Sequence, residues 1–540
     1  MIRILFIFLL LPHFVLCQSR DYKNYDKAVK YFNKGKNERA KDIIIKIIEE
    51  NPNWNKPYFL ISSILSSEGN IPLSADYLLK IYNKNNIEDI EGMENIVDLY
   101  YTNGYYANAL EYLRIMRGLD STFKEKKMIR YINNCLFAIK SISSPEIFSP
   151  EYLGPEINTS MSEYLPALSI DGSKLVFTRR IEDINKDPQE DFYVSNIDNG
   201  IWSSAIPFSN VINTAYNEGA LSFSPDLSMV VYTACNRPDG KGRCDLYFMV
   251  NNKNYNAGKI INSKYWESQG VFSPDNKYLY FVSNRPGGYG GKDIWRSEYK
   301  DGKFLSPVNL GPDINTEYDE MSPFVHQDNL TFYFASEGHI GMGGYDLFMS
   351  RRNNTEDAWK SIENLGFPIN TYRTENSLIV SYDGKTAYYV SDMVTEDSFG
   401  QEDILRFTLP EPKRAQHISE FEIDILASNK GAEIILKNVL FATNSIDLNK
   451  SAIEELNRLI EYLLKNPKIE IEIQGHTDDI GSKKDNQILS EKRAESIYDY
   501  LSQRVGNTLI YKGYGEESPL IPNNDDDSRR INRRTSFIIR

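Results

Sequence analysis

The strongest constraint on this chain is a pattern that returns five times between residues 149 and 410. Each copy begins with Ile-Asn-Thr or Ile-Asn-Ser, and a glutamate follows four residues after the Thr or Ser. These glutamates are Glu163, Glu218, Glu267, Glu320 and Glu375. An aspartate comes eight residues after each of them, then a run rich in β-branched and aromatic residues, then a second aspartate. A period of about 50 residues with several short strands is typical of one propeller blade per copy. The sequence therefore predicts an all-β, five-bladed propeller.

The repeated carboxylates allow two interpretations. Two of them could form a catalytic pair that cleaves glycans or peptides, and a ring of them could bind a cation. A catalytic pair is asymmetric, however, whereas a residue that recurs in every blade usually has the same structural role in each. A Gly-x-Ser-x-Gly nucleophile motif is also absent from the sequence. We therefore expect these acids to cap turns and bond neighbouring strands, and we expect no catalytic residue.

Two cysteines lie in the second copy of the repeat. Alignment with the third copy places Cys235 and Cys244 on opposite sides of one hairpin loop. Hairpin flanks bring Cβ atoms within bonding range, so the sequence predicts a Cys235–Cys244 disulfide. Cys135 instead lies in an apolar helical stretch, where a buried, inert thiol is expected.

The first 17 residues have the character of a secretory signal. Arg3 precedes an apolar run over residues 4–11, which is too short to span a membrane. We expect a signal peptide over residues 1–17 and a secreted chain in which disulfides are stable. The alternative is that Cys17 becomes a lipidated first residue. Since no later run approaches 18 apolar residues, no transmembrane helix is expected.

Composition excludes two classes of function. The chain has 540 residues, with 75 acidic and 61 basic, for a formal net charge of −14. Non-specific nucleic-acid binding needs a basic surface, so no nucleic-acid partner is expected. Five histidines and four cysteines also leave little material for a metal cluster, and we expect neither a metal nor a cofactor.

Residues 20–143 have the apolar spacing of helices, with small residues that return after thirty-odd positions. The pattern resembles about three tetratricopeptide repeats, an all-α array that commonly binds peptides or partner proteins. A plain helical bundle is the alternative. In the next region, Ser224-Pro225-Asp226 and Ser273-Pro274-Asp275 resemble the WD40-like repeat of TolB-type propellers.

A polar linker over residues 411–427 leads to a C-terminal α/β domain over residues 428–540. Residues 451–464 are predicted to form an amphipathic helix, and a second helix is expected to begin near Asn486. Ile469, Ile471 and Ile473 alternate with glutamates, which predicts a strand with one buried face.

The motifs of this domain are Gly475-His476-Thr477-Asp478, Asn486, Leu489-Ser490, Arg493-Ala494, Gly513-Tyr514-Gly515 and Asn532-Arg533-Arg534. Together they resemble the peptidoglycan-binding domain of the OmpA C-terminal family. The resemblance implies an OmpA-like fold that binds the diaminopimelate of the stem peptide without covalent attachment.

Roles for individual residues follow from the same resemblance. Asp478 would bind the ligand ammonium and Arg493 its carboxylate, while Thr477, Asn486 and Asn444 would add hydrogen bonds. This suits the chemistry, because a zwitterion needs one fixed anion and one fork-shaped cation. The alternative for Asp478 and Arg493 is a structural ion pair. His476 is expected in the core or behind the residues that contact the ligand, and not as a metal ligand, and either Arg533 or Arg534 is expected to pack or bridge locally.

The whole arrangement resembles multidomain OmpA-family proteins of Bacteroidota, including the peptidoglycan-binding component of the type IX secretion system. This resemblance implies a periplasmic scaffold that is associated with the outer membrane. The helical repeats and the propeller would bind outer-membrane or secretion-system proteins, and the C-terminal domain would tether them to the wall. A propeller enzyme and a TolB-like envelope relay are the alternatives.

Overall fold

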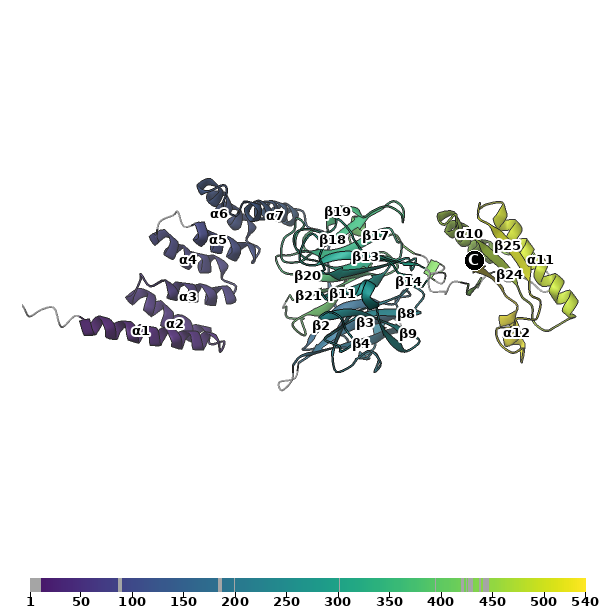
Figure 1. Ribbon diagram of the computed structural model, residues 1–540, viewed down its shortest axis with the longest axis horizontal. Helices are drawn as coiled ribbons and strands as arrows, with labels where there is room; N and C mark the ends of the chain where they lie inside the picture. Colours follow the sequence, from purple (N-terminus) through teal and green to yellow (C-terminus); the bar gives the residue numbers. More distant parts are fainter. Residues whose placement is uncertain are drawn as a thin grey trace, which may run out of the picture. The chain divides into compact units, whose positions relative to one another are not determined.

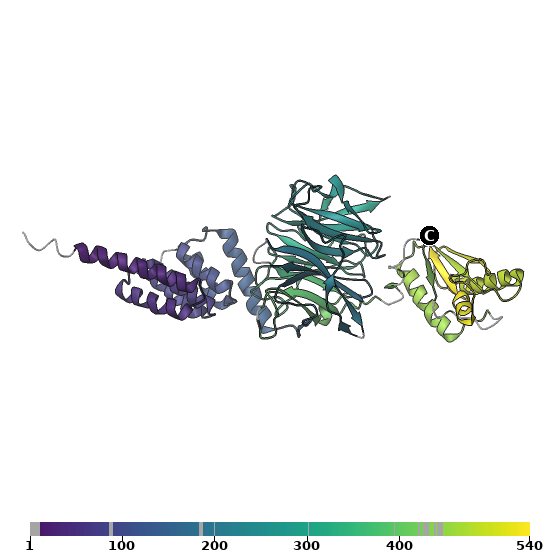
Figure 2. The same ribbon diagram turned by 90° about the horizontal axis from the view of Figure 1, so that it is seen from below.

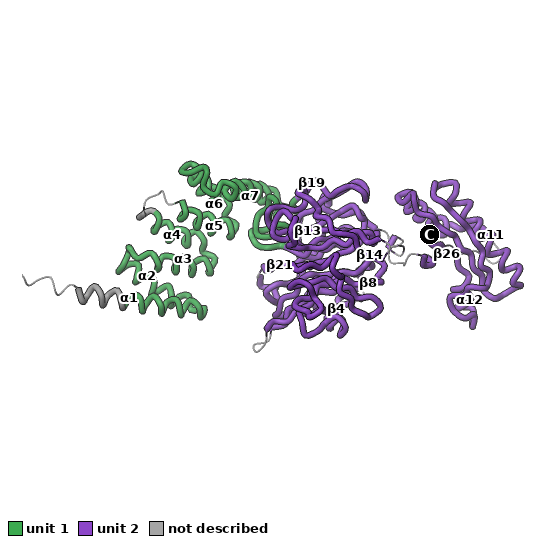
Figure 3. Tube along the Cα trace, in the orientation of Figure 1, with its two compact units in different colours: residues 1–146, 336–347, 364–375 green, residues 147–335, 348–363, 376–540 purple. Residues whose placement is uncertain are grey.

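The computed structural model describes residues 11–85, 90–182, 187–198, 200–300, 302–393, 395–418, 422, 423, 425, 431–436, 439 and 446–540. The chain divides into two compact units (Figure 3). The first comprises residues 1–146, 336–347 and 364–375, and the second comprises the remainder. The molecule therefore has a helical N-terminal region, a many-stranded β region and an α/β C-terminal domain.

The helical region is a succession of helices in which each packs on the next (Figure 1). They are α1 (Leu11–Phe32), α2 (Asn37–Glu50), α3 (Asn55–Ser67), α4 (Ile71–Asn85), α5 (Ile90–Tyr101), α6 (Tyr106–Leu119) and α7 (Glu125–Ser143).

The same turn closes the first helix of three successive pairs. Gly35, Gly69 and Gly104 stand at these turns with φ of +68°, +76° and +79°, a conformation that only glycine adopts without cost. Each glycine amide donates to the carbonyl three residues earlier, and the next amide donates to the carbonyl five residues earlier. The spacing of 34 and 35 residues between these glycines reproduces the period that the sequence predicts.

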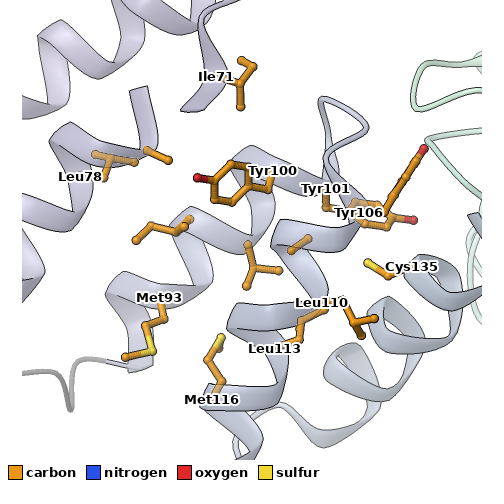
Figure 4. Packing of buried hydrophobic residues seen from close by; sticks show 14 of the residues in the cluster. Ile71, Leu78, Met93, Tyr100, Tyr101, Tyr106, Leu110, Leu113, Met116 and Cys135 are labelled. Carbon is orange, nitrogen blue, oxygen red and sulfur yellow. The ribbon is translucent and has the colours of Figure 1, made fainter. Parts of the chain in front are cut away.

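Aromatic and aliphatic side chains from α4 to α7 form one core (Figure 4). Tyr101 stacks on Tyr131 with ring centroids 4.4 Å apart, and the Tyr101 hydroxyl accepts a 2.7 Å hydrogen bond from the Asn134 amide. Cys135 is fully buried in this core, and burial raises the pKa of its thiol to about 12. Its thiol is therefore un-ionised, as expected for an inert cysteine.

Two loops that are distant in sequence complete the first unit. From residues 336–347, the Met342 carbonyl accepts a 3.0 Å hydrogen bond from the Tyr106 hydroxyl, and Met342 joins the helical core. From residues 364–375, the Phe367 amide donates to the Ser141 hydroxyl at 2.9 Å. Helices α6 and α7 therefore pack on segments whose sequence neighbours are strands of the β region.

The β region consists of five antiparallel sheets, seen in two views in Figures 1 and 2. The first sheet has β2 (Ser162–Leu168), β3 (Lys174–Ile181), β4 (Gln189–Asp198), β5 (Ile201–Trp202) and β6 (Ile206–Pro207). The second has β7 (Asn217–Phe223), β8 (Met229–Cys235), β9 (Cys244–Val250) and β10 (Lys253–Asn256). A short helix, α8 (Gly258–Ile261), precedes the third sheet.

The remaining sheets follow the same plan. The third has β11 (Glu267–Phe272), β12 (Tyr278–Ser283), β13 (Asp293–Lys300), β14 (Lys303–Phe304) and β15 (Val308–Asn309). The fourth has β16 (Glu320–Val325), β17 (Thr331–Ser336), β18 (Asp346–Arg351) and β19 (Lys360–Asn364). The fifth has β20 (Glu375–Val380), β21 (Thr386–Ser391) and β22 (Asp403–Thr408), and its outer strand is β1 (Glu151–Tyr152) from the opposite end of the region.

The asparagine of each Ile-Asn-Thr/Ser motif joins neighbouring sheets. Its side chain accepts from a backbone amide of the preceding sheet and donates to the carbonyl of the same residue, at 2.7–3.0 Å. The pairs are Asn158 with Ile404, Asn213 with Phe192, Asn262 with Leu246, Asn315 with Ile294 and Asn370 with Leu347. The first pair links the first copy to the last, so the same contact also joins the two ends of the β region.

The repeated acids have internal partners. Each glutamate of the repeat is buried and accepts hydrogen bonds from the backbone amide and the hydroxyl of the Thr or Ser four residues earlier. Each aspartate eight residues later accepts from the backbone amide two residues beyond it. The second aspartate of copies two to five accepts from two loop amides. These contacts agree with turn-capping roles.

The inner strands of the five sheets line one cavity of about 90 Å³. The residue two positions after each repeated glutamate lines it and has φ between 51° and 58°. These residues are Leu165, Ala220, Gln269, Ser322 and Ser377. The left-handed residue coincides with a bulge in the pairing of β2, β7 and β11 with their neighbours. In the second sheet, Cys235 and Cys244 form a disulfide across the β8–β9 pair.

The start of the linker packs on the β region. Lys413 pairs with Glu363 at 2.5 Å, and its carbonyl accepts from the Tyr333 hydroxyl at 2.7 Å. The 3₁₀ helix η1 (Glu411–Lys413) gives this segment local order.

Among its described residues, the C-terminal domain has one four-stranded sheet in the order β23-β26-β24-β25. Its elements are β23 (Glu433–Ile435), α10 (Lys450–Lys465), β24 (Ile471–Gly475), α11 (Lys483–Ser502), β25 (Leu509–Gly513), α12 (Asp526–Asn532) and β26 (Thr535–Ile539). Strands β24 and β25 are parallel, and α10 and α11 contribute to a core with Ile471, Ile473 and Phe537. Among the described residues, no helix is long and apolar enough to cross a membrane.

Helix α11 begins at Lys483 after the cap residue Ser482, three residues before Asn486 and so close to the predicted start. One expectation for this domain needs correction. Strand β24 is buried on both faces, because Glu472 is covered by hydrogen bonds from Gln474 at 2.8 Å and Tyr514 at 2.9 Å and by an ion pair with Arg540.

Candidate ligand-binding site

The candidate site lies where the parallel strands β24 and β25 end. Their carboxyl ends meet at one sheet edge, where ligands of α/β sheets commonly bind. Glycines let the strands approach helix α11 closely. A Cβ on Gly475 would come within 2.1 Å of the Ser490 carbonyl oxygen, and one on Gly513 within 2.4 Å of the Glu491 amide. The Ser490 hydroxyl accepts from the Gly515 amide at 2.9 Å, which joins the helix to the loop after β25.

Asp478 lies three residues beyond β24 and is 6% exposed. Its Oδ1 accepts from the Ile480 amide at 3.1 Å. Its Oδ2 accepts from Nη1 of Arg533 at 2.5 Å. The carboxylate is thus oriented by one backbone amide and one guanidinium.

Arg493 lies on α11 and is 5% exposed. Burial is the largest cause that lowers the pKa of its guanidinium, the charge of Arg533 lowers it further, and the charge of Asp478 raises it. The three groups are therefore close enough to interact. A buried cation beside a buried anion can bind both ends of a zwitterion.

Neutral groups surround this charged centre. The side-chain amide of Asn486 donates to the backbone carbonyl of Asp478 at 3.3 Å and to Oε2 of Glu516 at 2.6 Å. Thr477 is tied by its backbone amide to the Gly515 carbonyl at 2.9 Å. Within the described part of the chain, the buried Thr477 hydroxyl has no hydrogen-bond partner. An unsatisfied buried hydroxyl is costly, and a ligand could satisfy it.

His476 is a core residue, as expected. Its ring stacks on Tyr514 with centroids 5.3 Å apart. Burial and the charge of Arg534 lower its pKa to about 4, despite the opposing charge of Glu433. The ring is therefore neutral near neutral pH.

Arg534 is the arginine that bridges locally. It forms a two-point ion pair with Glu433 at 2.7 and 3.0 Å and also donates to the Ser518 carbonyl. Burial raises the pKa of the Glu433 carboxyl, but hydrogen bonds from Arg534 and Ser536 outweigh burial and lower it. This pair links β23 to the residue that precedes β26.

The structure brings together four of the five residues that the sequence predicts for this site. Asn486 bonds the Asp478 carbonyl, Arg493 interacts with the charge of Asp478, and Thr477 precedes Asp478 in the chain, while Asn444 lies outside the described residues. The side chain of Cys17 also lies outside them, and so do residues 1–10. The sequence did not assign Arg533 or Glu516 to the site. The Asn532-Arg533-Arg534 motif pointed to Arg533 without separating it from Arg534.

Among the described residues, no group of three or more His, Cys, Asp or Glu side chains is placed to hold a metal ion.

The comparisons concern this domain. Residues 440–533 match the OmpA family, so the C-terminal region carries an OmpA-family domain. A 102-residue segment is 35% identical to the peptidoglycan-associated lipoprotein of Buchnera aphidicola subsp. Baizongia pistaciae, covering 18% of this chain and 59% of that protein. A 103-residue segment is 31% identical to the peptidoglycan-binding protein ArfA of Mycobacterium tuberculosis, covering 19% of this chain and 32% of that protein. The matched segments thus span less than two thirds of these relatives.

Among solved structures, the peptidoglycan-associated lipoprotein of Burkholderia pseudomallei matches 19% of this chain and 88% of its own, with 29% identity and a TM-score of 0.18.

Proposed function

We propose that the C-terminal domain binds peptidoglycan non-covalently, at the diaminopimelate of the stem peptide. The observation that carries this proposal is that the buried Asp478 and Arg493 have opposite, interacting charges, and that the buried hydroxyl of the preceding Thr477 has no hydrogen-bond partner among the described residues. A free amino-acid end has one ammonium and one carboxylate, which this pair complements. Relatives named for peptidoglycan association or binding support peptidoglycan as the ligand.

The rest of the chain is proposed to be a scaffold that this domain tethers to the wall. The five sheets are interpreted as blades of a propeller, because β2, β7, β11 and β16 contact one another in sequence and β2 also contacts β21 and β22. The helix pairs are interpreted as tetratricopeptide-like repeats, from the recurring glycine turn. Both regions would bind outer-membrane or secretion-system proteins in the periplasm, with type IX secretion as the particular case that the sequence suggests.

This scaffold role suits weak binding at a single site. The wall displays its peptides at very high local density, so each domain that is released rebinds a neighbouring peptide. Lipidation of Cys17 would add an anchor at the membrane, and mass spectrometry of the secreted chain would detect it.

Sedimentation of the full chain with isolated sacculi tests the proposal. We expect the wild-type chain to pellet and both Asp478→Asn and Arg493→Gln to lose about tenfold or more in affinity. Matched controls are Asp479→Asn and Arg529→Gln, which remove the 2.8 Å ion pair made by the residue that follows Asp478. If the controls lose binding equally, the loss of affinity comes from the changed charge of the domain and not from this site. If the wild type stays soluble, the proposal is wrong.

A further inference from the structure

The cavity between the inner strands of the five sheets has an uncharged lining. It measures about 90 Å³ and is lined by residues of β2, β7, β11, β16 and β20 and of the turns that follow two of these strands. Among the described residues that line it, none is an aspartate, glutamate, lysine, arginine or histidine, although the first four types make up 25% of the chain. Most of its surface comes from side chains such as Leu168, Val271 and Phe324. A charged ligand group would lose its hydration here without gaining a counter-charge, so the lining selects against charge.

Two glutamines interrupt this apolar lining, and each occurs in one copy of the repeat only. Gln327 follows β16 and precedes Asp328, at a position where the second and third copies have Pro225 and Pro274. Gln269 is the left-handed residue of β11, and no other copy has an amide side chain at that position. A residue that serves the repeated fold recurs in every copy. A polar group found in a single copy is therefore a candidate for binding a ligand.

Gln269 has a structural contact that uses only half of its amide. Its Oε1 accepts a 2.7 Å hydrogen bond from the backbone amide of Ser322 on the next inner strand. On β7 and β11, a threonine hydroxyl of the preceding sheet bonds the corresponding backbone amide at 3.2 Å. The third sheet has Val282 at the position of these threonines, so Gln269 replaces the missing acceptor. Because the contact uses the side-chain carbonyl, the amino group remains as a donor for a ligand.

Gln327 offers the complementary group. Its Oε1 is buried and has no hydrogen-bond partner within the described part of the chain. An unsatisfied buried carbonyl oxygen is costly, and a ligand N–H would satisfy it. The cavity thus combines one donor and one acceptor with an apolar surface. A peptide group has the matching N–H and C=O and carries no charge. A saccharide fits less well, because each of its hydroxyls that found no partner on the apolar lining would add a desolvation cost.

We propose that this cavity binds a short, uncharged and mostly apolar segment of a partner polypeptide, whose backbone amides pair with Gln269 and Gln327. The inference rests on the scaffold role proposed for the β region. It adds the place where that region binds and the chemistry of the segment that it accepts. It does not involve the C-terminal domain, so the two sites can be tested separately.

An array of blocked octapeptides of random sequence, probed with the purified full chain, tests the inference. We expect the bound peptides to be depleted in Asp, Glu, Lys and Arg at their central positions. The tightest of them is then titrated calorimetrically. Gln327→Met should bind it about threefold to tenfold more weakly, because methionine keeps the size of the side chain and lacks the acceptor. Gln401→Met, the same change at an exposed glutamine of the β region, should bind like the wild type.

A second pair of variants tests the selection against charge. Ser377 lines the cavity with a φ of 58°, a conformation that Asn and Asp adopt more readily than most residues. Ser377→Asp adds a charge to the lining and should abolish binding, whereas Ser377→Asn has the same size, is neutral and should keep most of it. The melting transition of the β region shows whether each variant is folded.

Three results would overturn the inference. The first is that no peptide binds, or that the bound peptides are as charged as the array itself. The second is unchanged affinity in Gln327→Met and Ser377→Asp, since the peptide would then bind elsewhere. The third is competition by the trimer of N-acetylglucosamine, which would assign the cavity to a saccharide. Sedimentation of the same preparation with sacculi separates the two proposals, because a chain that pellets but binds no peptide keeps the proposed wall binding and loses only this inference.

Discussion

The β region and the C-terminal domain both bury carboxylates, but they use them differently. Glu163 is fully buried and is held by Thr159 and by Arg179, itself only 9% exposed. Asp478 is nearly as buried, but Arg533, which donates to its Oδ2, has a half-exposed side chain. Burial alone therefore does not separate a structural acid from one that we propose to bind a ligand. The separating feature is whether a partner can be exchanged for a ligand.

The two regions also differ in how many copies of the buried acid they contain. The contact between the repeated glutamate and its Thr or Ser recurs in all five copies. Arg179, Arg237 and Arg285 pair with the glutamates of the first three copies at 2.7–3.6 Å. Asp478 and Arg493 occur once, at an edge where parallel strands end. A charged residue with a structural role recurs in every copy of the repeat, whereas a binding site needs only one copy.

The largest effect on stability is expected for Glu163→Ala. The change leaves the buried Arg179 without its carboxylate and the Thr159 amide and hydroxyl without their acceptor. Breaking a buried ion pair costs about 3–5 kcal/mol. Calorimetry should show a lower melting temperature for the transition of the β region. Binding to sacculi should not change, and a loss of binding with an unchanged melting temperature would break the comparison.

Removal of the disulfide is expected to have the next largest effect. Cys235 and Cys244 are nine residues apart and close a short loop. In the chain-entropy account, a loop of this length contributes about 2–3 kcal/mol. The double variant Cys235→Ser/Cys244→Ser should unfold at correspondingly lower urea concentration than the oxidised wild type. Reduction of the wild type should reproduce the loss, and an unchanged midpoint after reduction would contradict it.

A pH dependence is expected from Asp346. Burial raises the pKa of this carboxyl to about 7, although the amides of Met342 and Gly343 oppose the shift. The unfolded chain has the ordinary value of 3.8. Between the two values the folded chain binds more protons, so its stability falls as pH rises through that window and is constant above it.

The measurement is the melting temperature of the first unit at about pH 5 and about pH 8. We expect a decline of several degrees in the wild type and none in Asp346→Asn, which is neutral throughout. A decline that persists in the variant would assign the effect to another group.

The smallest effect on stability is expected for Asp478→Asn. Its ion pair with Arg533 has a half-exposed partner and contributes about 0–1 kcal/mol, and asparagine keeps an acceptor for the Ile480 amide, so the buried Arg493 is the main group left without a counter-charge. The melting temperature of the C-terminal domain should therefore fall less than that of the β region in Glu163→Ala, although binding to sacculi is lost. This is the reverse of the result expected for Glu163→Ala. A large stability loss would instead support the structural ion pair that the sequence left open.

Many of the local contacts were predictable because the residues that form them lie a few positions apart in the sequence. The repeated glutamate is four residues from the Thr or Ser that it accepts from, and the two cysteines flank one hairpin loop. The helix-pair period was also readable, since the Gly35, Gly69 and Gly104 turns recur at the same position. Such contacts depend on turn geometry and spacing, which sequence alone carries.

The candidate site was predictable only in part. Thr477, Asp478, Asn486 and Arg493 stand in one strand–loop–helix segment, so a motif could name them together. Arg533 comes from a position 55 residues beyond Asp478. Its neighbour Arg534 carries the same charge but pairs with Glu433. The direction of the chain after α12 decides which of these two arginines is turned toward the candidate site. No local pattern in the sequence encodes that direction.

The sequence by itself predicted the repeat, its turn chemistry, the cysteine pairing and most residues of the candidate site, because each depends on neighbours a few positions away. Tertiary structure alone decided the contacts that span hundreds of residues. Asn158 bonds Ile404 across 246 positions, and Tyr106 bonds Met342 across 236. It also decided that Glu472, which the alternating pattern places on an open face, is buried beneath Tyr514 and Arg540. Alternation reports that the two faces of a strand differ in polarity, but only the packed chain determines what covers them.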